Sequence, residues 1–317
     1  MNGNLFNTLL AIMLPIAFGF VLKGRLFKEH EIAALRKFVM RVGIPFLIFQ
    51  NLFHADMQSI RQALPIVISF MLLTTLYTAA ASLIAPRVAD NQKQRLTFAF
   101  SVFAGNYAFL GWGVVVAFFG NQALTRAVFF SMFFWPVFLS CGFFMRRMDG
   151  DDRTEKRTGF LTVMARHAGV PIATAFLALT LNLAGVRLPV VLEDFISRFA
   201  SLAIPLILFA IGQNLNLFMP REQLRLVLGA SLFRLIGGWG LGLMVMLAVR
   251  LIFKVDALSQ QVILLQAAMP TATMSTFFSE YVQLDDSLLS GIIAFSTLLS
   301  FITLPIWVLL INRIVTG

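Results

Sequence analysis

One segment limits the fold more than any other, because the residues from Leu96 to Thr125 include no charged side chain. A helix needs roughly 20 apolar residues to cross a bilayer, and this segment is longer. Its centre nevertheless holds Gly105, Asn106, Gly111 and Gly113, and each glycine weakens a helix by up to about 1 kcal/mol. An apolar run of membrane length with a polar, glycine-rich centre indicates a transmembrane helix that is interrupted.

A second uncharged run extends from Ala257 to Ser279, and the sequence from Ala268 to Thr273 interrupts it. This interruption contains Pro270, and proline breaks a helix interior because it lacks the N–H donor. The two interrupted runs are therefore candidate partners in a single site.

The composition places both runs in a membrane protein. The chain has 317 residues, of which 59% are hydrophobic and 13% charged, whereas a soluble domain has about 25% charged residues. Uncharged runs of this length predict helices rather than a barrel. The net charge of +10 comes from basic residues between the apolar runs, which indicates headgroup contact and topology rather than nucleic-acid binding. The single cysteine, Cys141, excludes an intramolecular disulfide.

The apolar runs predict ten membrane spans. Their approximate ranges are 5–22, 36–54, 63–85, 95–119, 123–145, 161–184, 196–218, 224–250, 258–280 and 287–311. Residues 146–158 form a charged loop that divides the chain into a first five-helix unit, 1–145, and a second, 159–317.

The distribution of basic residues predicts the orientation. With the N-terminus outside, 18 of the 25 lysines and arginines fall on the cytoplasmic side and the other 7 outside. Because cytoplasmic loops carry the excess of basic residues, we expect both termini outside and loop 146–158 in the cytoplasm of a bacterial inner membrane.

The two halves repeat a pattern. Pro45 and Pro205 are 160 residues apart, and the interruptions at Asn106 and Pro270 are 164 apart. Between these positions, Gln50-Asn51 corresponds to Gln213-Asn214 with an offset of 163 residues. Each half has five spans, an odd number, so the second half enters the membrane inverted relative to the first. Inverted repeats with discontinuous helices place a substrate site near the bilayer midplane, where broken spans 4 and 9 cross.

The interruptions supply the candidate binding residues. The second half-helices begin near Asn106 and Pro270, and a helix N-terminus carries about half a positive charge, which suits an anion. Hydrogen-bonding groups of Asn106, Tyr107, Thr271 and Thr273 accompany them. The alternative is that the interruptions only let spans pack closely. The candidate substrate-binding residues at the two interruptions are Gly105, Asn106, Tyr107, Pro270, Thr271 and Thr273.

The amide pairs in spans 2 and 7 complete the candidate set. Gln50, Asn51, Gln213 and Asn214 either line the same central cavity or bond across helices, because amides in lipid need partners. On span 10, a row of hydroxyl residues from Ser296 to Thr303 favours helix packing.

Ionisable side chains inside the spans are few. Arg234 lies well inside span 8, where it either balances a bound anion or extends to the cytoplasmic interface, and we favour the second. Arg126 is expected to reach the outer surface. Glu280 and Asp56 stand at span ends, so a proton relay, a carboxylate-built sodium site or a bound metal or cofactor has little support.

Sequence patterns of enzymes are missing. The three histidines lack metal-ligand spacing, and no P-loop, Gly-x-Ser-x-Gly or His-Glu-x-x-His motif occurs. The small-residue run from Gly237 to Gly242 is interpreted as a helix-packing face. We therefore expect no enzymatic activity.

The segments Met269–Tyr281 and Ser296–Pro305 resemble the C-terminal signature of the auxin efflux carrier family. Gly105-Asn106-Tyr107, followed by Leu110-Gly111, resembles that family's span-4 crossover, where members often carry proline and this chain carries Gly105 and Asn106 instead. The short central loop resembles the bacterial branch, which includes permeases named for malonate and malate.

This resemblance implies an all-α integral membrane protein of ten helices in two inverted five-helix repeats, similar to bile-acid transporters. It also implies a scaffold of spans 1, 2, 6 and 7, often dimeric, and a mobile transport unit of spans 3–5 and 8–10 that moves like an elevator.

The expected function is secondary transport of a small organic anion, such as a dicarboxylate or an auxin-like acid. Membrane lipids and a second copy of the chain are the expected partners. A sodium-coupled carrier of the bile-acid type and a membrane sensor or scaffold that binds without transport are the alternatives.

Overall fold

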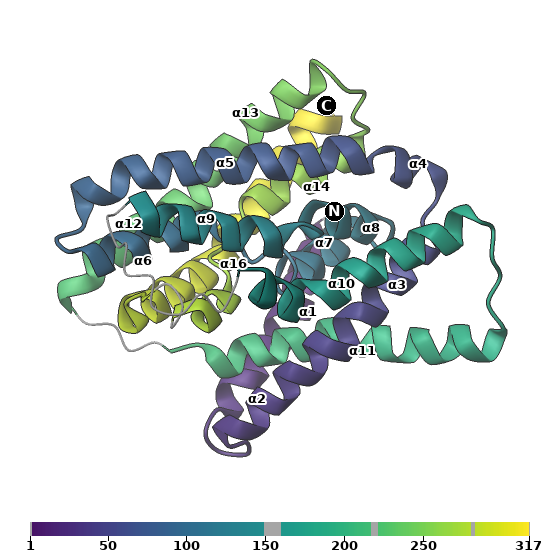
Figure 1. The fold of residues 1–317 in the computed structure, drawn as a ribbon, viewed down its shortest axis with the longest axis horizontal. Coiled ribbons are helices and arrows are strands. Elements are labelled where there is room, and N and C mark those ends of the chain that lie inside the picture. The colour runs from purple at the N-terminus through teal and green to yellow at the C-terminus, as the bar shows by residue number, and fades with distance from the viewer. Residues whose placement is uncertain (1, 149–159, 217–220, 280–282, 317) are drawn as a thin grey trace.

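The computed structural model describes residues 2–148, 160–216, 221–279 and 283–316, and within them the chain is helical with no β-strand (Figure 1). The helices of the first half are α1 (Asn2–Leu22), α2 (Glu29–Phe38), η1 (Val39–Gly43), α3 (Ile44–Phe53), α4 (Met57–Arg61), α5 (Ala63–Val88), α6 (Gln92–Phe103), α7 (Gly111–Phe119), α8 (Gln122–Ser131) and α9 (Phe134–Met148). Those of the second half are α10 (Phe160–Leu183), α11 (Val190–Asn214), η2 (Arg221–Gln223), α12 (Leu224–Leu232), η3 (Phe233–Gly237), α13 (Gly238–Arg250), α14 (Ala257–Ala267), η4 (Thr273–Phe278) and α16 (Asp286–Thr316).

Several helices are long and apolar enough to cross a membrane. In the described part of the chain, five helical segments meet this criterion, and two shorter apolar helices accompany them. The five are residues 63–88, 122–142, 190–214, 221–250 and 286–315. The chain is therefore an all-α, multi-pass membrane protein, and the count of ten crossings and their inverted order stay predictions. Most of the charged loop, residues 149–159, and Glu280 lie outside the described residues.

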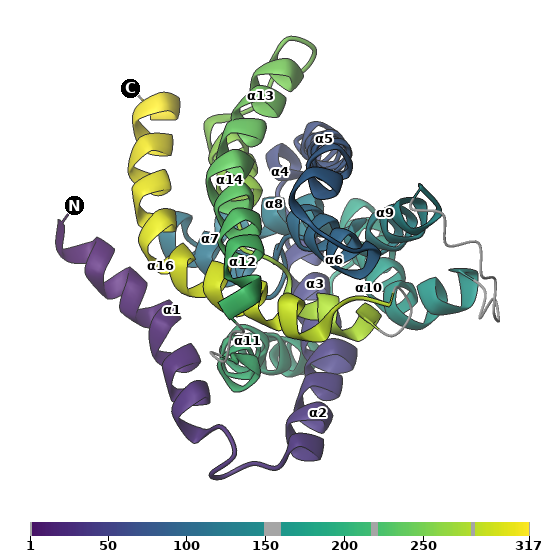
Figure 2. The ribbon, with the colours of Figure 1, turned by 90° about the vertical axis from the view of Figure 1, so that its left-hand side faces the viewer.

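The helix contacts form two groups. Helices α1, α3, α10 and α11 pack mainly on one another, while α5, α6, α8, α12, α13, α14 and α16 form a second network of contacts. In Figure 2, α1, α2 and α11 occupy the lower part of the view, and α5, α13 and α14 the upper part. Contacts of α3 with α8 and of α1 with α16 join the groups directly, and α7 and α9 each contact helices of both groups.

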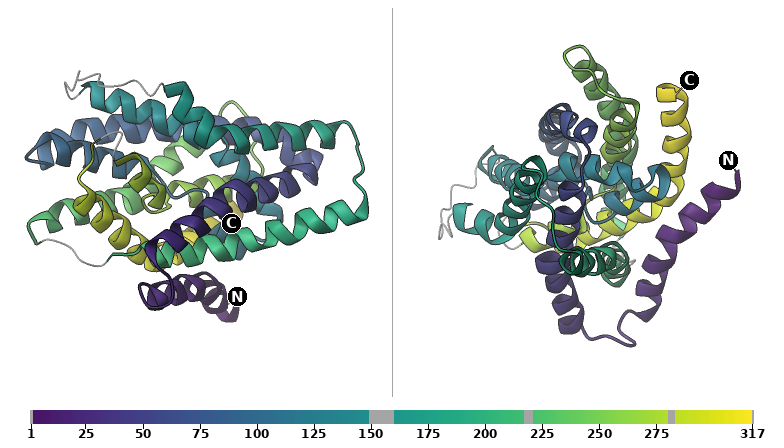
Figure 3. Two further views of the ribbon diagram at one scale, coloured as in Figure 1. Left: turned by 60° about the horizontal axis from the view of Figure 1, so that its bottom comes forward. Right: turned by 90° about the vertical axis from the view of Figure 1, so that its right-hand side faces the viewer.

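Two glycines bring α1 and α11 into close contact. A Cβ atom on Gly19 would lie less than 3.0 Å from the carbonyl of Phe209, and one on Gly212 would overlap the carbonyl of Ile16 in the same way. Small residues let membrane helices approach at backbone distance. Leu14 and Phe18 of α1 are exposed, and Figure 3 shows this helix at the edge of the molecule.

The helices are interrupted where the sequence weakens them. Pro45 begins α3 and lacks an N–H donor, and the π-helical turn η1 precedes it. The second π-helical turn, η3, contains Arg234. Full breaks separate α6 from α7 and α14 from η4, at both of the interruptions predicted from the sequence.

Candidate functional site

The two breaks pair with each other. Gly105 and Thr271 form an antiparallel bridge. On either side of it, the Asn106 N–H donates to the Pro270 carbonyl at 2.8 Å, and the Ala272 N–H donates to the Ala104 carbonyl at 2.8 Å. Each break thus satisfies backbone groups that the other leaves free, which a lipid-surrounded backbone requires. We call the paired residues 104–107 and 269–273 the crossover.

Asn106 presents a free donor at the crossover. Its side chain is 2% exposed, and its Oδ1 accepts from the Leu110 N–H at 3.2 Å. Its Nδ2 has no hydrogen-bond partner among the described residues. A buried, unpaired N–H donor is costly unless a ligand or water accepts from it.

The polar groups of Thr271 form hydrogen bonds within the protein. Its Oγ1 donates to the Ser101 carbonyl at 3.0 Å, and its N–H donates to the Ser296 Oγ at 3.3 Å. Ser296 therefore supports the crossover from α16. The hydroxyl of Thr271 fixes the second break to α6 and is not free for a ligand in this structure.

Arg234 is fully buried, so the expectation that it extends to the cytoplasmic interface is wrong. Its Nε donates to the Met269 carbonyl at 2.8 Å, its Nη1 to the Val102 carbonyl at 3.2 Å, and its Nη2 to the Tyr107 hydroxyl at 2.9 Å. These acceptors come from both breaks. The side chain turns inward because the carbonyls there lack helical partners.

The contact with Arg234 explains the glycine at position 105. A Cβ atom on this residue would lie less than 3.0 Å from Nη2 of Arg234 and would touch the Tyr107 ring at 2.5 Å. A side chain at 105 and the guanidinium cannot both occupy this space. Gly105 is thus a packing requirement of this crossover.

Gln266 is a site residue that sequence reasoning missed. It is fully buried on α14, and its Nε2 donates to the Tyr107 carbonyl at 3.2 Å. Its Oε1 has no partner among the described residues and lies so close to Gly111 that a Cβ atom there would overlap it. The sequence alone could have indicated this residue, because a glutamine four residues before Pro270 in an uncharged run is costly in lipid unless it has partners.

A cavity of about 50 Å³ adjoins the crossover. Gly105, Asn106 and Tyr107 line it, together with Ala272 and Met274 from the second break. The rest of its wall is mostly apolar and comes from both helix groups. Its larger apolar members are Ile44, Ile48, Phe109, Trp112, Phe134 and Trp135. The hydroxyl of Ser131 also faces it but accepts from the Trp112 Nε1 at 3.0 Å.

The other predicted residues lie elsewhere. Pro270 and Thr273 belong to the second break, which contributes Ala272 and Met274 to the cavity wall. Gln50 and Asn51 line a separate, polar cavity of about 580 Å³ between α3, α8 and α11. Gln213 is buried with its Nε2 unpaired among the described residues, and Asn214 ends α11. The structure therefore does not bring the amide pairs to the crossover.

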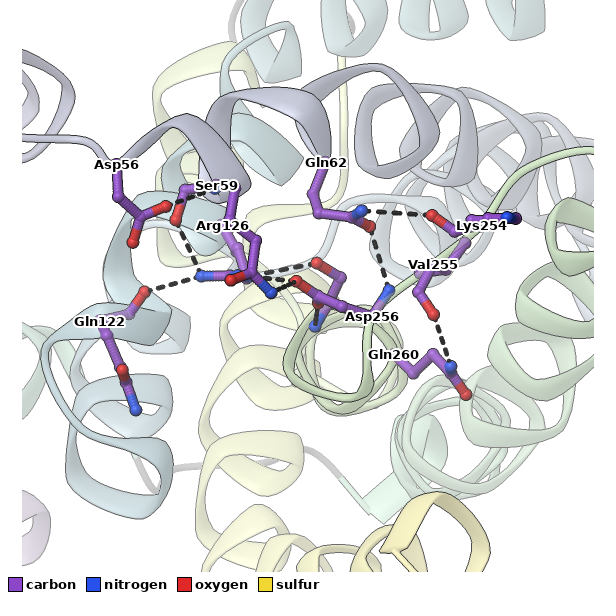
Figure 4. Close-up of polar contacts among 11 residues, drawn as sticks. Asp56, Ser59, Gln62, Gln122, Arg126, Lys254, Val255, Asp256 and Gln260 are labelled. Atoms are coloured by element: carbon purple, nitrogen blue, oxygen red, sulfur yellow. Dashed lines mark hydrogen bonds and ion pairs between the residues drawn. The ribbon is translucent and has the colours of Figure 1, made fainter.

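A second polar cluster surrounds Arg126, which is 3% exposed, so the expectation that it reaches the outer surface is wrong. Figure 4 shows the guanidinium between two helix N-termini. It forms an ion pair with Asp256 at 2.8 Å and donates to the Oγ atoms of Ser59, at 2.9 Å, and Ser259, at 3.1 Å. Burial alone would raise the pKa of Asp256, but hydrogen bonds from Arg126 and Ser259 outweigh it and lower that pKa.

Comparison with known proteins identifies the family. Residues 4–308 match the family model described as "Membrane transport protein". The chain belongs to this family, the auxin efflux carriers. Relatives include an uncharacterized transporter of Methanothermobacter thermautotrophicus, 28% identical over 95% of this chain and 96% of the relative. An uncharacterized transporter of Methanocaldococcus jannaschii is 22% identical over 95% of this chain and 97% of its own length. This auxin efflux carrier family member is therefore a membrane transport protein and not an enzyme.

Proposed function

We propose that this family member is a secondary transporter for a small organic anion, bound in the cavity beside the crossover. The observation that carries the proposal is the unpaired Nδ2 of Asn106, a buried donor on a residue that lines a mostly apolar cavity. A carboxylate oxygen would accept from this group. Small-molecule sites combine an apolar wall with a few polar groups that fix orientation. At about 50 Å³ this cavity is smaller than an organic anion, so in this proposal it widens when the substrate binds.

The wall of the cavity favours one of the two anion classes expected from the sequence. A monocarboxylate with an apolar body, like the auxin-like acids, would place its body against Ile48, Trp112 and Trp135. A dicarboxylate would bring a second charge against the same apolar surface, where an unpaired charge is costly. We therefore place small monocarboxylates before malonate and malate.

The position of the cavity supports an elevator-like movement. Its wall contains Ile44 and Ile48 of α3 and Ala175 of α10, which belong to the first helix group. Most of the rest comes from the crossover, from the segment between it and α7, and from helices α7, α8 and α9. A substrate held between the groups would cross the membrane if the second group carried the crossover past a fixed first group. In this proposal α1, α3, α10 and α11 form the scaffold, through which two copies would pair.

Transport and binding assays on purified protein test the proposal. Proteoliposomes would be loaded with radiolabelled phenylacetate or malonate, with protein-free liposomes as the control for passive permeation. We expect protein-dependent phenylacetate flux that exceeds malonate flux. Binding without flux would instead support a sensor, and flux that disappears when choline replaces sodium would support the sodium-coupled alternative. A preference for malonate would reverse the assignment of substrate class.

A further inference from the structure

A buried cation without a carboxylate partner lies directly behind the candidate site. Arg234 is 0% exposed, and arginine stays charged in proteins. Arg126 forms an ion pair with Asp256, whereas Arg234 forms none with a carboxylate of the described residues. A buried charge is expensive unless its surroundings compensate for it.

Two helix ends supply that compensation. Val102 is in the last turn of α6, and Met269 follows the end of α14 by two residues; both carbonyls accept from Arg234. Each helix C-terminus carries about half a negative charge. The rings of Tyr77 and Tyr107 also face the guanidinium, with its carbon 4.2 Å and 5.2 Å from the two ring centres.

The charges at the crossover then sum to a positive value. The two C-terminal ends are negative by about half a charge each and together offset Arg234, while α7, which starts at Gly111 after the first break, begins with about half a positive charge. The second break is followed by η4, a 3-10 helix of six residues that is too short for a comparable dipole, so the sum is positive. Arg234 occupies the negative ends, and Asn106, whose Nδ2 is unpaired among the described residues, lines the cavity.

We propose that Arg234 gives this site its preference for anions. It neutralises the C-terminal ends of α6 and α14, so that the site keeps a net positive charge that a monocarboxylate in the cavity balances. Arg234 does not line the cavity and reaches it through Gly105 and Tyr107, so it is a positioning residue. This inference rests on the proposed function and assigns the origin of its charge selectivity.

The alternative is that Arg234 only ties the two breaks together. A tie would affect a charged and a neutral ligand equally, whereas a compensating charge affects only the charged one. The test therefore measures dissociation constants of phenylacetate and of its neutral analogue phenylacetamide for purified full-length protein. The variants are Arg234→Gln, which removes the charge, and Arg234→Lys, which keeps the charge but replaces the planar guanidinium by an ammonium group.

We expect the wild type to bind phenylacetate more tightly than phenylacetamide. In Arg234→Gln the ratio of these two affinities should fall at least about tenfold, while the affinity for the amide stays unchanged. We expect Arg234→Lys to keep the preference and to unfold at a lower temperature, because an ammonium group cannot bridge the same three acceptors. If Arg234→Gln keeps the same ratio of acid to amide affinity as the wild type, the inference is overturned. If that variant does not fold, the neutral Arg234→Met takes its place in the same measurement, and loss of the preference in Arg234→Lys overturns the inference equally.

A hydrogen-exchange measurement separates this inference from the proposed function. Peptides that cover residues 100–107 and 268–273 should exchange faster in Arg234→Lys than in the wild type, with or without ligand. If the wild type binds no carboxylate, the proposed function fails and anion selection by Arg234 fails with it. Faster exchange would then still establish the tie between the breaks, and unchanged exchange would remove that role as well.

Discussion

At the scale of single residues, one missing side chain decides whether the crossover can form. Gly105 lies against the guanidinium of Arg234 and the ring of Tyr107, so Gly105→Ala forces the buried cation to shift. We expect a loss of about 1–3 kcal/mol in stability, the usual cost of overpacking. Thermal unfolding in detergent measures it. Gly240→Ala is the matched control, since nothing lies within 4 Å of its added Cβ. Equal melting temperatures for the two variants would contradict the contact.

A substitution at Asn106 tests directly whether the site binds an anion. Asn106→Asp keeps the Oδ1 that accepts from the Leu110 N–H but replaces the free Nδ2 donor by an acceptor. We expect phenylacetate affinity to fall at least about tenfold, because a donor is lost and two negative charges meet. Asn216→Asp, at an exposed position beyond α11, is the control for the added charge. Undiminished binding in Asn106→Asp would remove this residue from the site.

At the scale of helices, Arg126 joins elements from three parts of the chain. Asp56 and Asp256 cap the N-termini of α4 and α14 by accepting from the N–H groups of Ser59 and Ser259. Arg126 on α8 then bonds to the hydroxyl of each serine. One guanidinium thereby holds two capped helix starts together.

This cluster predicts a dependence of stability on pH. The pKa of Asp256 is lower in the folded protein than in the unfolded chain, because the hydrogen bonds from Arg126 and Ser259 favour the carboxylate. Its stabilisation is therefore present above the unfolded pKa, roughly 4, and is lost as pH falls through the folded value. We expect Asp256→Asn to lower the melting temperature at pH 7 and the difference to shrink below pH 4. Asp194→Asn, on an exposed position of α11, should show no such change; a constant Asp256→Asn difference would be against the mechanism.

The two helix breaks can be predicted from the sequence, but the side-chain contacts that stabilise them cannot. Glycine, asparagine and proline in uncharged runs are visible because each weakens a helix locally, and Gly105 and Thr271 indeed pair. The inward turn of Arg234 depends on carbonyls that become free only after the breaks have formed. Arg126, at the start of span 5, is expected at the outer surface, but its inward position depends on Asp256, which is 130 residues away in the chain. Contacts of that kind leave no local pattern.

At the scale of the whole molecule, a second cluster mirrors that of Arg126. Asp285 at the start of α16 accepts from the Gln223 side chain, and its N–H donates to the Thr97 hydroxyl. Asp285 follows Arg126 by 159 residues, close to the offset of the sequence repeat. The loops that meet in each cluster are those expected on one side of the membrane. Both facts support the proposed inverted repeat, with one polar cluster at each end of the second helix group.

If the second helix group moves past the first, a cross-link between them should stop transport. Asn51 on α3 and Thr125 on α8 suit this test, because the Thr125 hydroxyl lies 3.4 Å from the Asn51 carbonyl. We expect a bis-methanethiosulfonate, which links two cysteines through reducible disulfides, to abolish phenylacetate flux in Asn51→Cys/Thr125→Cys, made in a Cys141→Ser background. A reductant should restore the flux.

The matched control cross-links two helices of the same group. Gln261 on α14 and Asn312 on α16 are joined by a side-chain hydrogen bond of 2.9 Å, so their cysteine pair should react equally well. A rigid moving body would tolerate this link, and flux should persist. Flux that survives the α3–α8 link would show that transport needs no movement between the groups. Inhibition by both links would instead indicate rearrangement inside the second group.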